Sequence, residues 1–249
     1  MLKPELVLSN TTTFFSGNLE KVFRKAKKYG FKYLEIIPYR WTTPYEISSL
    51  EKKYNIQVAG IHMPLYWQGN PKPSVFDFIF GLYLGGAAKS PGRAITESLS
   101  SRKPYLLLHV NVADEMGDQF ETTAKQFHVL LENIPYQKKC PQYYWDPDAL
   151  QSKFKDQAGL VFDPGHYHQI PANVAHLDIL DLYRKISPEV IHISYHSKFH
   201  LLPNQKEQVE LKQILQIRRP QYIVIETNPW VSVKKGKKML EEILSHCER

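Results

Sequence analysis

Short apolar segments alternate with helical patterns from one end of the chain to the other. The apolar segments are rich in Val, Ile, Leu and Tyr and carry few charges, which is typical of parallel strands buried on both faces. The predicted strands are residues 6–9, 33–37, 57–62, 105–110, 129–133, 159–163, 190–194 and 222–226. Between them apolar residues recur at helical spacing, as in residues 19–26, before Gly30. Repeated strand-and-helix units of this kind predict an α/β fold, a (β/α)8 TIM barrel formed by residues 1–249 as a single domain.

The connection between the third and fourth predicted strands is longer than the others. Residues 71–101 contain Gly85, Gly86, Pro91 and Gly92, which interrupt the helical pattern. We therefore expect a helix followed by an irregular excursion over the barrel mouth, where it could serve as a lid.

Composition narrows the class of protein. The chain has 249 residues, of which 43% are hydrophobic and 23% charged, as expected for a globular protein of the length of one barrel. Its two cysteines, Cys140 and Cys247, are far apart, so we expect neither a disulfide framework nor a thiolate metal site. We also expect no membrane span and a cytoplasmic location. The net charge of +7 favours phosphate-bearing partners only weakly, because clustered lysines fall on predicted solvated helices.

Ionisable side chains occur at six consecutive predicted strands, at or near the strand ends. They are His62, His109, Glu132, Asp163, His192 and Glu226. In a TIM barrel the carboxyl ends of the strands meet at one mouth, where active sites lie. Burying so many ionisable groups without a cation would cost several kcal/mol per charge, so we predict a site for one or more divalent metal ions.

The donor set limits the choice of metal. Imidazole and carboxylate groups without thiolate suit Zn²⁺ or Mn²⁺ first, with Co²⁺, Fe²⁺ or Mg²⁺ as alternatives. We expect no organic cofactor.

The strand ends resemble those of the xylose isomerase-like TIM barrel superfamily, which includes AP endonuclease family 2 and sugar phosphate isomerases and epimerases. The resemblance spans nearly the whole chain. It rests on Gly60-Ile-His62-Met-Pro64, Leu108-His109-Val, Leu131-Glu132-Asn133, Asp163-Pro-Gly-His166, His192-Ile-Ser and Ile225-Glu226-Thr-Asn-Pro229.

Each branch of the superfamily implies its own metal ligands. Similarity to the epimerases implies that one metal binds to Glu132, Asp163, His192 and Glu226, with His166 near the substrate. Similarity to endonuclease IV implies a second metal on His62 and His109, with Glu132 bridging. A third metal in that branch needs His166 and an Asp-x-His pair. His200 could supply the histidine of that pair, but the aspartate has no clear equivalent, which argues against a trinuclear centre.

The first functional hypothesis is a metal-dependent isomerase or epimerase of a sugar or sugar phosphate. A metal would make a substrate C–H proton acidic, and Glu132 and Glu226 would act as general base and acid. His166 would stabilise the negative charge that develops on the substrate oxygen. Arg40 and Lys198 are candidates for binding a substrate phosphate.

The alternative is an endonuclease IV-like phosphodiesterase, an AP endonuclease acting on DNA. Two ions that share Glu132 would generate hydroxide and neutralise the leaving oxygen. Basic and aromatic residues after the second and third predicted strands, including Arg40 and Trp67, could contact substrate or nucleic acid. A non-catalytic binding role is a third interpretation, and an oligomer is compatible with the sequence.

Overall fold

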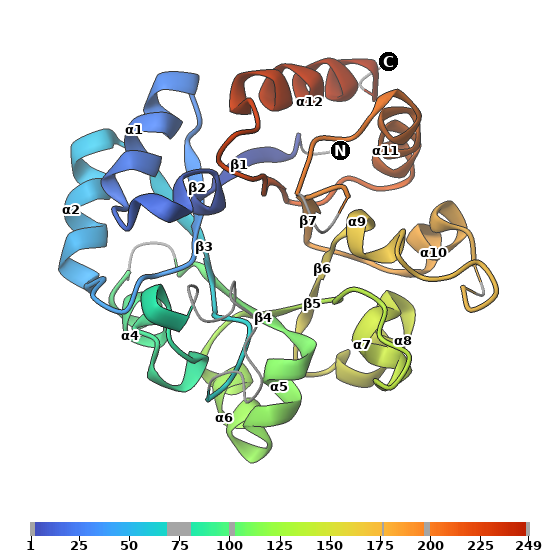
Figure 1. Ribbon diagram of the computed structural model, residues 1–249, viewed down its shortest axis with the longest axis horizontal. Helices are drawn as coiled ribbons and strands as arrows, with labels where there is room; N and C mark the ends of the chain where they lie inside the picture. The colour runs from blue at the N-terminus through green and yellow to red at the C-terminus, as the bar shows by residue number, and fades with distance from the viewer. Residues whose placement is uncertain (1–2, 69–80, 100–102, 176, 197–199, 248–249) are drawn as a thin grey trace.

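Eight parallel strands close into a barrel in the order β1 to β8, and the helices lie outside it (Figure 1). The structure is a computed structural model that describes residues 3–68, 81–99, 103–175, 177–196 and 200–247. The strands are β1 Glu5–Ser9, β2 Tyr33–Ile36, β3 Gln57–His62, β4 Tyr105–His109, β5 Val129–Glu132, β6 Gly159–Phe162, β7 Val190–Ile193 and β8 Tyr222–Ile225. Each strand begins and ends within one residue of its predicted bounds. The predicted (β/α)8 TIM barrel is confirmed.

The helices that surround the barrel follow most strands in turn. They are α1 Glu20–Tyr29, α2 Pro44–Tyr54, α4 Gly92–Ser98, α5 Val110–Met116, α6 Asp118–Gln126, α7 Gln142–Trp145, α8 Pro147–Phe154, α9 Pro164–Tyr167, α10 Ile179–Lys185, α11 Gln205–Ile217 and α12 Val233–Cys247, with 3-10 helices η1 Asn10–Ser16 and η2 Ala87–Lys89. Local sequence sets their ends. Gly30 ends α1 at a φ of 69°, and the Thr43 side chain caps α2 by accepting from the backbone N–H of Glu46. No helix in these ranges is long and apolar enough to cross a membrane.

The long connection between β3 and β4 is described in part. Residues 69–80 and 100–102 lie outside the described residues, so the predicted helix and lid are only partly covered. The described part contains η2 and α4, and α4 packs on the barrel close to β3. Its first residue, Gly92, is so near that a Cβ atom there would lie 2.5 Å from Sδ of Met63.

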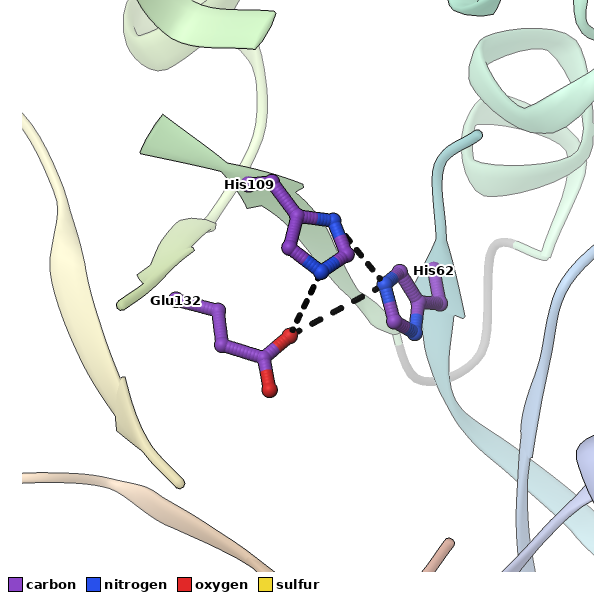
Figure 2. A group of neighbouring side chains, drawn as sticks. All are labelled: His62, His109 and Glu132. Carbon is purple, nitrogen blue, oxygen red and sulfur yellow. Dashed lines mark hydrogen bonds and ion pairs between the residues drawn. The ribbon is translucent and has the colours of Figure 1, made fainter. Parts of the chain in front are cut away.

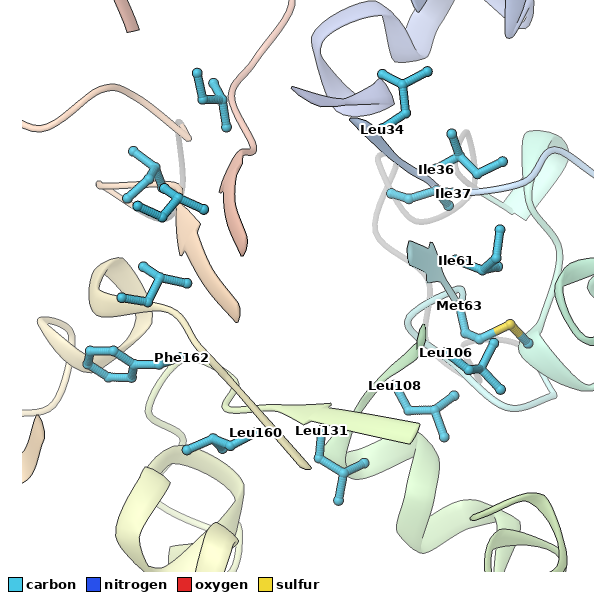
Figure 3. Close-up of a cluster of buried hydrophobic side chains, with 14 of the residues drawn as sticks. Leu34, Ile36, Ile37, Ile61, Met63, Leu106, Leu108, Leu131, Leu160 and Phe162 are labelled. Atoms are coloured by element: carbon cyan, nitrogen blue, oxygen red, sulfur yellow. The ribbon is translucent and has the colours of Figure 1, made fainter. Parts of the chain in front are cut away.

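Alternate residues of each strand point to opposite sides of the barrel wall. One set points outward and packs against the helices; Figure 3 shows Ile61, Leu106, Leu108 and Phe162 extending away from the strands in this way. The other set fills the interior, where aliphatic side chains form a separate cluster under the mouth. Its members include Leu107, Leu130, Val161, Val190 and Val224.

The alternation also places the ionisable residues. Two positions beyond each of those five interior residues come His109, Glu132, Asp163, His192 and Glu226. A period of two keeps a residue on the same face of a strand, so these side chains also point inward, one layer nearer the mouth. The fold thus sets a polar layer on top of an apolar one.

Candidate metal centre

The six predicted ligands converge at the carboxyl ends of the strands, and all six are buried. They form two groups in which every residue offers a ligand atom within 4.8 Å of the others. The first group is His62, His109 and Glu132, and the second is Glu132, Asp163, His192 and Glu226. Glu132 belongs to both groups, so one carboxylate joins two candidate metal sites.

The first group brings two imidazoles to one oxygen of Glu132 (Figure 2). Oε2 of Glu132 lies 3.4 Å from Nε2 of His109 and 3.9 Å from Nε2 of His62. The two rings are neighbours, with Nε2 of His62 3.4 Å from Nδ1 of His109. These are three converging donors of the kind that bind zinc.

The second group is centred on the ring of His192. Its Nδ1 atom lies 3.0 Å from Oε1 of Glu132 and 3.0 Å from Oε2 of Glu226. The Asp163 side chain accepts from the backbone N–H of His166 at 3.1 Å and from the hydroxyl of Ser194. Two of its neighbours thus hold Asp163 in place beside the other ligands.

The donor atoms are close together but do not satisfy one another. Both carboxylate oxygens of Glu132 and Nδ1 of His192 are buried and have no hydrogen-bond partner among the described residues, in spite of the 3.0 Å separation. Their distances are short while their orientations are wrong for a hydrogen bond. Buried polar atoms without partners are costly, and a shared cation would satisfy them together. The residues present therefore fit a divalent metal ion.

The mutual electrostatics keep Glu226 charged. Burial raises the pKa of Glu226, but the charges of His192 and His62 outweigh it and hold the pKa well below its usual value. Burial lowers the pKa of His192, yet the surrounding carboxylates raise it well above normal. Burial and the neighbouring charge of His62 lower the pKa of His109 far below its usual value. His109 is therefore a neutral imidazole, the form that binds metals.

One buried carboxylate in this centre was not predicted from the sequence. Glu35 on β2 is fully buried, and its Oε2 atom accepts from Nε2 of His192 at 3.1 Å and from the hydroxyl of Tyr105 at 2.6 Å. Burial raises its pKa, but His192 and His62 outweigh burial and bring the pKa to about 2. The sequence feature that could have indicated this residue is a glutamate inside the otherwise apolar predicted strand of residues 33–37.

A cavity of about 570 Å³ opens above the two groups. His62, His109, His166 and Glu226 form part of its wall, so the candidate metal centre faces the cavity. His166 donates from Nδ1 to the backbone carbonyl of Asn133 at 2.7 Å, and its Nε2 atom lies 3.6 Å from Oδ2 of Asp163. The volume is in the range of pockets that hold a small molecule.

The remaining candidates lie around this cavity or away from it. His200 lines it, although no group of three metal-ligating residues found in the described chain includes His200 or His166. Arg40 is exposed and runs beside Gly85, while Trp67 is buried in the outer core. Neither is among the described residues that line the cavity. Lys198 lies outside the described residues.

Comparison with known proteins gives matches in structure alone. No protein-family model matches the sequence, and no curated protein matches it. Among solved structures, the chain is similar to an AP endonuclease of family 2 from Brucella melitensis, with 14% identity, a TM-score of 0.64 and coverage of 96% of this chain and 98% of that one.

The chain is also similar in structure to two sugar epimerases. The 3-keto-D-glucoside 4-epimerase from E. coli has 15% identity and a TM-score of 0.61, with 99% of each chain covered. An L-ribulose 3-epimerase has 12% identity and a TM-score of 0.65, with 99% of this chain and 96% of that chain covered. A xylose isomerase domain protein from Salmonella typhimurium also matches, at a TM-score of 0.55. The chain therefore has the fold of the xylose isomerase-like TIM barrels, as its strand-end motifs indicated.

Proposed function

We propose that this protein is a divalent-metal-dependent sugar isomerase or epimerase that acts by proton transfer. The observation that carries the proposal is the buried group of Glu132, Asp163, His192 and Glu226 beside a cavity of small-molecule size. The similarity in fold to two sugar epimerases supports the same reaction class.

The four residues of that group would hold the ion. When bound, it would supply Lewis acidity that makes a C–H bond next to a substrate carbonyl acidic. Glu132 would take the proton from that carbon as general base, and Glu226 would return one as general acid. Glu132 ends β5 and Glu226 follows β8, so the two carboxylates that meet at Nδ1 of His192 come from different parts of the barrel rim.

His166 would orient the substrate. Its bond to the carbonyl of Asn133 fixes the ring and turns Nε2 toward Asp163 and the cavity. Burial lowers the pKa of His166, but the charges of Asp163, Glu132 and Glu226, together with the bond to the Asn133 carbonyl, outweigh burial and raise the pKa, which favours the protonated ring. A protonated Nε2 would donate a hydrogen bond to a substrate oxygen on which negative charge develops.

The cavity wall favours an uncharged sugar over a sugar phosphate. Among the described residues that line it there is no lysine or arginine, while Ile37, Met63, Leu84 and Ile134 form apolar surface. The described part of the wall therefore offers no lysine or arginine, the residues that usually bind a phosphate group.

Hydrogen exchange tests the proposal without knowledge of the product. The protein, loaded with Mn²⁺ or Co²⁺, is incubated in D2O with ketoses and keto-glycosides, and deuterium incorporation at carbon is followed by NMR. We expect exchange with at least one substrate, and its loss in Glu132→Gln by at least about 100-fold, since the base is removed. Glu189→Gln, which changes a carboxylate far from the mouth, is the matched control. Equal exchange in Glu132→Gln and wild type would refute the assignment.

The first group of ligands favours a second candidate function, phosphodiester hydrolysis. His62 and His109 would hold a second ion that shares Glu132, the arrangement used by two-metal hydrolases. Metal analysis of protein purified without added ions separates the two functions. Two tightly held zinc ions per chain, together with cleavage of abasic DNA, would favour hydrolysis. One exchangeable ion and no binding to DNA at low salt would exclude it.

A further inference from the structure

Glu35 lies directly inside the barrel, below the two groups of metal ligands. Its strand, β2, pairs with β1 and β3, and the glutamate itself is opposite Ser9 on one side and Gly60 on the other. None of its side chain is exposed to solvent. It is not a member of either group of ligands, so its role is not that of a direct metal ligand.

Each oxygen of Glu35 faces a histidine from a different group. Oε2 accepts from Nε2 of His192 at 3.1 Å. Oε1 lies 3.6 Å from Nδ1 of His62, slightly beyond hydrogen-bond range, and neither of these buried atoms has a hydrogen-bond partner among the described residues. One carboxylate therefore lies beside both rings.

These contacts determine which ring nitrogens remain for a metal. A carboxylate accepts hydrogen bonds, so the His192 ring carries its proton on Nε2 and leaves Nδ1, which faces Glu132 and Glu226. In the same way a proton on Nδ1 of His62 leaves Nε2, which faces His109 and Glu132. The second nitrogen of a ligand histidine is commonly held in this way by a carboxylate.

Two further residues, Tyr105 and Gly60, determine where the Glu35 side chain lies. The Tyr105 hydroxyl donates to Oε2 at 2.6 Å, which holds the carboxylate from below. The Tyr105 ring crosses β3 at Gly60, where a Cβ atom would lie 2.2 Å from the ring atoms Cε2 and Cζ. The absence of a side chain at position 60 is therefore what lets the tyrosine reach Glu35.

We propose that Glu35 is a positioning residue that fixes the tautomer and the orientation of His192 and His62, so that both metal groups depend on it. The inference rests on the proposed function, since it assumes that these groups bind a divalent ion. Replacing the carboxylate by an amide removes one of the two acceptor oxygens. The histidine that meets the amide N–H₂ must then put its proton on the metal-facing nitrogen, where a proton blocks binding.

The test is the affinity of the purified protein for Co²⁺, measured by the visible absorption of the bound ion and by competition with a chelator. We expect Glu35→Gln to bind Co²⁺ about 10- to 100-fold more weakly than wild type. Glu189→Gln is the matched control, because it makes the same change of carboxylate to amide at a residue that pairs with His128 and belongs to neither group of metal ligands. Its affinity should stay close to that of wild type.

A second measurement uses only the wild-type protein, so it stands even if Glu35→Gln fails to fold. In the Zn²⁺-loaded protein, the ¹⁵N chemical shifts of the histidine rings should show His192 protonated on Nε2 and coordinated through Nδ1. The opposite tautomer, or equal Co²⁺ affinity in wild type and Glu35→Gln, would overturn the role of Glu35 alone. Failure of the wild type to bind any divalent ion would overturn the proposed function as well.

Discussion

Replacing Gly60 by alanine should destabilise the barrel from its interior. The new Cβ atom would lie 2.2 Å from two ring carbons of Tyr105, whereas carbon atoms in contact are normally about 3.5 Å apart, so the ring would have to move by about 1.3 Å. Tyr105 is only 4% exposed and sits in the interior cluster of a closed barrel, where there is little room to move.

The cost has two sources. Overpacking of a filled core costs about 1–3 kcal/mol. Movement of the ring also breaks the 2.6 Å bond from the Tyr105 hydroxyl to Glu35, and a hydrogen bond to a charged group contributes about 1.5–3 kcal/mol. We expect Gly60→Ala to lower the free energy of unfolding by about 3 kcal/mol, which corresponds to a fall in Tm of roughly 6–12 °C.

Urea unfolding, followed by circular dichroism with a chelator present, measures this cost apart from metal binding. Tyr105→Leu is the informative second variant, because leucine lacks both of the ring atoms that clash. In that background Gly60→Ala should cost less than about 1 kcal/mol, so the double-mutant cycle should show strong coupling. An equal cost in both backgrounds, or a cost below about 1 kcal/mol in the wild-type background, would refute the reasoning.

Three further predictions concern the metal, one surface ion pair and α9. Mn²⁺ or Zn²⁺ at about 100 times its Kd should stabilise the chelator-treated protein by about 2.7 kcal/mol, and scanning calorimetry that finds no change would contradict a folded-state metal site. Nε2 of His128 lies 2.8 Å from Oε2 of Glu189, and this bond raises the histidine pKa above its ordinary value of 6.5. The pair should therefore stabilise the fold below the unfolded-state pKa and lose its effect as the pH rises through the folded-state pKa. His128→Gln should lower the free energy of unfolding by roughly 0.2–1 kcal/mol near pH 5.5 and leave it unchanged near pH 8.5, as measured by urea unfolding at both pH values. A loss of stability that grows as the pH rises would contradict this prediction. In Gly165→Ala the new Cβ would lie 2.4 Å from the backbone oxygen of Ser194, so α9 must shift and carry His166 with it. We expect a loss of about 1–3 kcal/mol and weaker Co²⁺ binding, and unchanged values of both would show that α9 is not pressed against β7.

The strand pattern predicted the fold because burial on both faces leaves a signal in the local sequence. Continuous apolar runs mark the eight strands, and the ionisable residues that follow them stand out against the runs. Interior residues such as Leu107 and Val224 lie two positions before a ligand, so the same period of two that makes a strand also points the ligand inward. The position of these residues at strand ends was therefore readable without the structure.

Glu35 could not be placed in the same way, because its neighbours are set by the register between strands. It pairs with Gly60 after a register shift between Leu34 and Glu35. This irregularity determines the position of the glutamate along the barrel axis. The sequence pattern of residues 33–37 does not indicate that position. The contacts to His192 and Tyr105 join residues 157 and 70 positions away, which local patterns do not encode.

The buried carboxylates near the barrel mouth must be balanced by metal ions or by protonated histidines. The number of bound ions therefore affects which histidines stay protonated for the reaction. Four buried carboxylates contribute four negative charges when ionised, namely those of Glu35, Glu132, Asp163 and Glu226. Since uncompensated buried charge costs several kcal/mol, one divalent ion would have to be accompanied by two protonated imidazoles, and two ions by none. His62 and His166 stand outside the four-residue group, and the nearby carboxylates raise the pKa of both against the effect of burial. A centre with one ion can thus keep His166 protonated as a hydrogen-bond donor for proton transfer, whereas a centre with two ions must take the proton from His62 to make it a ligand.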